Sequence, residues 1–140
     1  MNDGFSSGIR SSENPQVQLE ATIHEGISRF EQEYMGREPK DIHTHLIGDL
    51  LVVRLKGVLT AAEQHLAKTR AADKGIVVLK ELRRGLIETA RPILEGMIRD
   101  VTGVPVLSLH HDISTVTGEE VVVFTLAQPP EYGQVKNRSA

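Results

Sequence analysis

Residues 41–56 read DIHTHLIGDLLVVRLK, and this stretch decides the fold. It contains two short runs rich in β-forming residues, and Gly48 and Asp49 between them are typical of a two-residue hairpin turn. In the register that such a turn sets, Asp41 lies opposite Lys56, and opposite charges at facing positions support the pairing. The stretch therefore predicts an antiparallel β-hairpin.

The same register divides the hairpin into two faces, because successive side chains of a strand point to opposite sides. The apolar face collects Ile42, Thr44, Leu46, Leu51, Val53 and Leu55. The polar face collects His43, His45 and Arg54. A sheet that packs on a core with one side only shows this pattern, so we expect helices to cover the apolar face alone.

A second pair of β-forming runs, 104–113 and 119–126, is joined by a polar turn and predicts another hairpin. Its first run places Ser108, His110 and Asp112 on one face. The other face collects Leu107, Leu109, His111 and Ile113. If both hairpins join one sheet with their apolar faces toward the helices, all polar-face residues lie together on the open side.

Three helices are expected around the hairpins. Apolar residues recur at steps of three and four between Val17 and Met35, and Gly36 is a natural stop. Thr60 and Glu63 form a capping box, which predicts a short second helix to about residue 68.

The longest helix is expected over residues 76–101, with a kink at Pro92 and an end at Gly103. Arg83 is expected on its polar side. The apolar stripe predicted to face the core contains Leu79, Leu82, Leu86, Ala90, Ile93 and Met97.

This order of elements predicts an α+β fold of two layers, in which helices pack on one face of an antiparallel sheet made of two β-hairpins. The single domain is expected over residues 16–127. Residues 1–15 and 128–140 are rich in Ser, Gly, Asn and Pro without a periodic apolar pattern, so we expect a disordered N-terminal tail and a flexible C-terminal tail.

Composition restricts the classes of function. The formal net charge of −3 argues against nucleic-acid binding, and the absence of cysteine excludes disulfides and thiolate metal sites. No run approaches the roughly 18 apolar residues of a membrane span, so we expect a cytoplasmic protein without direct membrane insertion.

The polar faces of the hairpins and the second turn hold the candidate residues for binding a partner or ligand. These are His43, His45, Arg54, Ser108, His110, Asp112, Ser114, Thr115 and Glu119. The sequence contains neither a GxSxG elbow nor a phosphate-binding loop, so we assign no catalytic residue, cofactor or metal. A metal-dependent or small-ligand-binding enzyme stays open as the alternative, because histidines two apart on a strand share a face and suit zinc.

Several segments together resemble the MpsC family of small bacterial proteins, formerly a domain of unknown function. They are MGREPKDI (35–42), GVLTAAEQHLA (57–67) and VTGVPVLSLHHDISTVTGEEVVVFTL (101–126), and the resemblance spans residues 17–126. It implies a non-catalytic accessory or regulatory role beside a Na⁺-translocating, membrane-potential-generating system that is linked to inorganic-carbon (bicarbonate) uptake. A membrane subunit similar to an antiporter is the implied partner, through which this chain would reach the inner membrane. We further expect a homodimer, because a sheet with an open face often associates.

Overall fold

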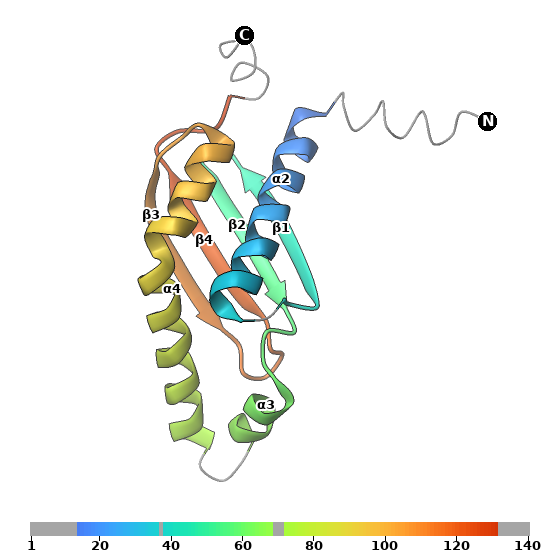
Figure 1. The fold of residues 1–140 in the computed structure, drawn as a ribbon, viewed down its shortest axis with the longest axis vertical. Helices are drawn as coiled ribbons and strands as arrows, with labels where there is room; N and C mark the ends of the chain where they lie inside the picture. Colours follow the sequence, from blue (N-terminus) through green and yellow to red (C-terminus); the bar gives the residue numbers. More distant parts are fainter. Residues whose placement is uncertain (1–13, 37, 69–71, 132–140) are drawn as a thin grey trace, which may run out of the picture.

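The protein folds as two layers, a four-stranded antiparallel sheet and a layer of helices on one of its faces (Figure 1). The structure, a computed structural model, describes residues 14–36, 38–68 and 72–131. The element order is α-ββ-α-α-ββ, which confirms the predicted α+β fold. The two predicted tails, 1–15 and 128–140, fall largely outside the described residues.

The first helix, α2 (Pro15–Phe30), begins at a side-chain cap. The Asn14 side chain accepts a hydrogen bond from the backbone N–H of Val17 at 3.2 Å, and proline in the first turn needs no donor of its own. A short π-helix, η1 (Glu31–Met35), continues α2 and ends at Gly36, whose φ of 89° is left-handed. The predicted helix and its glycine stop are confirmed.

The second helix, α3 (Ala61–Ala67), has the predicted capping box. The Thr60 hydroxyl accepts from the backbone N–H of Glu63 at 3.1 Å, and the Glu63 carboxylate accepts from the backbone N–H of Thr60 at 2.7 Å. The long helix, α4 (Ala72–Thr102), continues through Pro92 and ends before Gly103, whose φ is 74°.

The strands form one sheet in the order β1-β2-β4-β3, so the two hairpins join through their second strands. Their bounds are Asp41–Ile47 for β1, Leu50–Lys56 for β2, Val106–Ile113 for β3 and Glu120–Leu126 for β4. The register of the first hairpin is the predicted one throughout, with Asp41 opposite Lys56 and Ile47 opposite Leu50. Most of its predicted apolar face is buried in the core, where α2 contacts β1, while Thr44 is half-buried.

The prediction for Leu107 is wrong. A β-bulge shifts the register of β3 between Val106 and Ser108, so Leu107 leaves the alternation and is 66% exposed. Beyond the bulge the predicted alternation returns, and Leu109 and Ile113 are buried.

The predicted core stripe of α4 is also partly wrong, because the helix is rotated about its axis relative to the expectation. Leu82, Leu86 and Ile93 are exposed. Leu79 and Ala90 are buried as predicted. The other buried residues of α4 are Arg83, Ile87, Leu94 and Ile98, which the prediction left off the core stripe.

Burial of Arg83 depends on a cluster of charged groups in the core. Its guanidinium contacts the carboxylate of Glu120 on β4, whose side chain is fully buried, and lies 3.7 Å from the carboxylate of Glu31. The Nδ1 atom of His111 lies 3.5 Å from the second oxygen of Glu120. The cluster therefore ties α4 and the start of η1 to the first residue of β4.

Candidate binding surface

All six candidate residues from the strands lie on the face of the sheet that carries no helix, which we call the open face. The register arranges this face in rows that cross the four strands in the order β1, β2, β4, β3. The first row consists of His43, Arg54, Val121 and Asp112. The second row consists of His45, Val52, Val123 and His110. The third row consists of Ile47, Leu50, Thr125 and Ser108. The prediction that both polar faces share one side of the sheet is confirmed.

The centre of the open face is apolar. Leu50 and Val52 on β2 lie beside Val121 and Val123 on β4, and all four side chains are half-buried by their neighbours. Polar residues of the edge strands β1 and β3 flank this centre on both sides. An apolar centre with a polar rim is the usual anatomy of a protein-binding surface.

The histidines of the two hairpins do not meet. Because β1 and β3 are opposite edges of the sheet, three strand spacings of about 4.8 Å, or roughly 14 Å, separate His43 from Asp112. Within the described ranges, no group of three or more His, Asp or Glu side chains is placed to hold a metal ion. The strand order thus places the histidines of the two hairpins at opposite edges of the sheet.

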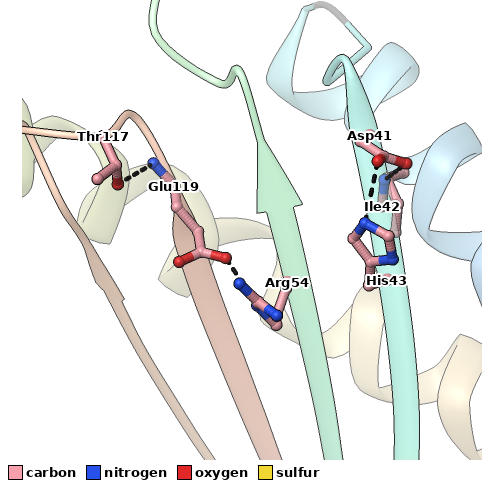
Figure 2. Close-up of polar contacts among 6 residues, drawn as sticks. All are labelled: Asp41, Ile42, His43, Arg54, Thr117 and Glu119. Atoms are coloured by element: carbon pink, nitrogen blue, oxygen red, sulfur yellow. Dashed lines mark hydrogen bonds and ion pairs between the residues drawn. The ribbon is translucent and has the colours of Figure 1, made fainter.

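Ion pairs lie along the first row of the open face (Figure 2). The Nε atom of Arg54 donates to the carboxylate of Glu119 at 2.7 Å, and the backbone N–H of Glu119 donates to the Thr117 hydroxyl at 3.2 Å. Nε2 of His43 lies 2.9 Å from the carboxylate of Asp41 on the same strand. These contacts fix the polar rim at one end of the face.

The turn between β3 and β4 adjoins a shallow groove of about 400 Å³. Four of the predicted candidates line the groove, namely Asp112, Ser114, Thr115 and Glu119. Ile76 and Lys80 of α4 line it as well. Lys80 reaches from α4 to Asp112 with an N–O distance of 3.2 Å. The backbone N–H of Ile113, and then Lys80, stabilise the charged carboxylate and hold the pKa of Asp112 below its usual value.

Both edges of the sheet are protected against pairing with another strand. On β1, the backbone of Leu46 donates to Glu20 at 2.9 Å and accepts from Gln16 at 3.0 Å, and both of these side chains come from α2. On β3, Lys80 passes the outer edge to reach Asp112, and the bulge distorts the other end. Charged side chains and bulges at sheet edges disfavour strand addition, and these contacts occupy part of each edge.

The sequence reasoning missed a second apolar surface, which we call the outer α4 patch. It consists of Val78, Leu82, Leu86 and Ile93, which are between 37% and 58% exposed. The sequence indicates this patch by the number of aliphatic residues on α4, which exceeds the number that a single buried stripe can hold. Spacing alone does not tell which of two apolar stripes of a helix is buried, so the sequence predicts three of these residues, Leu82, Leu86 and Ile93, in the core.

Fold and surface together define a small two-layer α+β domain whose sheet is open on one side. The chain belongs to the family described as the Na⁺-translocating membrane potential-generating system (MpsC), whose model matches residues 15–128. It is 34% identical over 113 residues to the uncharacterized protein YbcI of Bacillus subtilis (strain 168), a match that covers 81% of this chain and 89% of that protein. No solved structure matches the chain. None of the helices in the described ranges has both the length and the apolar character needed to cross a bilayer.

Proposed function

We propose that this chain is a non-catalytic accessory or regulatory protein of a Na⁺-translocating, membrane-potential-generating system that supports inorganic-carbon uptake, and that it works by binding proteins. The family supplies the name of the system. The observation that carries the binding role is that both layers of this small domain leave apolar surface uncovered, on the open face and at the outer α4 patch.

Single exposed apolar residues are common on folded proteins, but a contiguous group of them, such as the four aliphatic residues of the outer α4 patch, favours a binding protein. Leu82 is 51% exposed although it sits on a helix whose opposite side is well packed. Contiguous exposed apolar surface on a soluble domain commonly marks a place where another protein docks. We assign the outer α4 patch to a membrane subunit of the system.

Affinity purification of the tagged chain from mildly solubilised native membranes tests this proposal. We expect recovery of an integral membrane protein, and we expect Leu82→Glu to reduce that recovery at least tenfold. Arg84→Glu is the matched control, since Arg84 is an exposed residue of the same helix that lies outside the patch. Because both positions are exposed, neither change should unfold the protein.

Repeated purification without any membrane protein, at wild-type sequence and in mild detergent, would contradict the accessory role. Equal recovery with Leu82→Glu and with Arg84→Glu would instead show that the membrane subunit does not dock on the outer α4 patch. Circular dichroism of each variant confirms that a loss of recovery reflects the surface and not the fold.

A further inference from the structure

We infer that the open face is the interface of a homodimer, in which a second copy of this chain packs sheet against sheet about a two-fold axis parallel to the strands. The inference rests on the proposed protein-binding role and names the occupant of one of its two surfaces. It leaves the outer α4 patch free on both copies, because that patch lies on the opposite layer.

The choice of axis follows from the charges at the two ends of the first row. An axis parallel to the strands places β1 of one copy over β3 of the other, so His43 faces Asp112 of the second copy and Asp112 faces its His43. A histidine ring can donate an N–H hydrogen bond to a carboxylate in either protonation state. The edge charges of the face are therefore complementary to themselves under this symmetry.

A two-fold axis perpendicular to the strands gives a poorer match. It reverses the rows, so that His43 faces Ile47 of the second copy and Asp112 faces Ser108. No histidine then lies opposite a carboxylate of the second copy, whereas Arg54 faces an aliphatic side chain under either axis and keeps Glu119 as its partner. Charge complementarity thus selects the axis that runs along the strands.

The same axis joins the apolar centres of the two faces. Val52 then faces Val123 of the second copy, and Val123 faces its Val52. With strands about 4.8 Å apart and about 3.3 Å per residue, the face measures roughly 19 Å by 23 Å, or about 440 Å² in projection per copy. An interface of this size lies at the small end for specific complexes, so we expect a reversible dimer with a dissociation constant of about 10–100 µM.

Sedimentation equilibrium of the full chain between about 5 and 500 µM tests the inference. We expect a reversible monomer–dimer equilibrium, and we expect Val52→Glu to raise the dissociation constant at least thirtyfold. Val77→Glu is the matched control, because it is the same substitution at a residue of α4 that is 59% exposed and lies away from the open face.

A charge swap tests the predicted pairing directly. His43→Asp and Asp112→His should each weaken the dimer about three- to twentyfold, because each change brings like groups together at two symmetric places. The double variant should dimerise more tightly than the product of the two single effects predicts, although His43→Asp also brings a carboxylate beside Asp41 and Asp112→His removes the partner of Lys80. The two positions lie on opposite edges of one sheet, about 14 Å apart, so rescue can arise only between two copies.

A wild-type chain that stays monomeric at 500 µM would overturn the inference. So would a double variant whose dimer dissociation constant is raised by as much as the two single-variant increases multiplied together. If the chain stays monomeric and Val52→Glu also abolishes recovery of the membrane protein, the open face binds that protein instead. Recovery of the membrane protein by a strictly monomeric chain would leave the accessory role intact while removing the homodimer. Dimerisation without recovery of any membrane protein would support the homodimer and contradict the accessory role.

Discussion

Replacement of Arg83 by methionine should destabilise the protein more than any exposed substitution. The change removes the guanidinium that contacts the fully buried carboxylate of Glu120 and lies 3.7 Å from the buried carboxylate of Glu31. Breaking a buried ion pair from one side costs about 3–5 kcal/mol. This is a large part of the roughly 5–15 kcal/mol that stabilises a typical domain.

Urea denaturation followed by circular dichroism measures this effect. With a slope of about 2 kcal/mol per molar urea, a loss of about 4 kcal/mol lowers the unfolding midpoint by about 2 M. Arg84→Met is the control, because Arg84 is exposed, and it should change the free energy of unfolding by less than about 0.5 kcal/mol. The double variant Arg83→Met with Glu120→Leu should recover part of the loss, since it removes both charges of this pair while the buried carboxylate of Glu31 still loses its neighbour.

Two results would refute the reasoning. A loss below about 1 kcal/mol in Arg83→Met would mean that the carboxylate of Glu120 is already compensated or hydrated without Arg83. A double variant as unstable as the single one would mean that the cluster stabilises the fold through shape and not through charge.

Two further predictions concern the rotation of α4 and the turn of the second hairpin. Leu94→Ala should cost about 2–5 kcal/mol of unfolding free energy, whereas Leu82→Ala should cost less than about 1 kcal/mol, and equal losses in urea denaturation would contradict the observed orientation of α4. The pKa of Asp112 is lowered by the Ile113 backbone N–H and by Lys80. Its charged form therefore stabilises the fold at pH values above the usual pKa of 3.8. This stabilisation is lost as the pH falls through the lower pKa of the folded state. Asp112→Asn should therefore be less stable than the wild type at pH 6 by a small margin that disappears near pH 2, and a constant difference over that range would show that no such coupling exists.

The first hairpin was predictable in detail because its information is local. Gly48 and Asp49 set the turn, the turn sets the register, and alternation then assigns each side chain to a face. The six polar candidates on the strands fall on the open face for the same reason. The strand order, by contrast, depends on pairing between β2 and β4, which are far apart in the sequence, and no local pattern specifies it.

The orientation of α4 was not predictable from spacing, because the helix carries aliphatic residues on two neighbouring stripes. The stripe that faces the sheet includes an arginine, which a hydrophobic pattern excludes from a core. Arg83 is accepted there only because Glu120, 37 residues later in the sequence, supplies its partner. The bulge at Leu107 likewise has no signal in its own residues.

The position of β4 in the sheet has a consequence for biosynthesis. Of the four described strands this one comes last in the sequence, yet it lies in the interior of the sheet, where β2 and β3 both pair with it. Until β4 emerges, the nascent chain holds one hairpin with an unpaired edge, a strand β3 without a neighbour, and Arg83 without Glu120. The sheet can therefore be completed only after nearly the whole domain has been synthesised, and until then the growing chain exposes unpaired strand edges that are prone to aggregation.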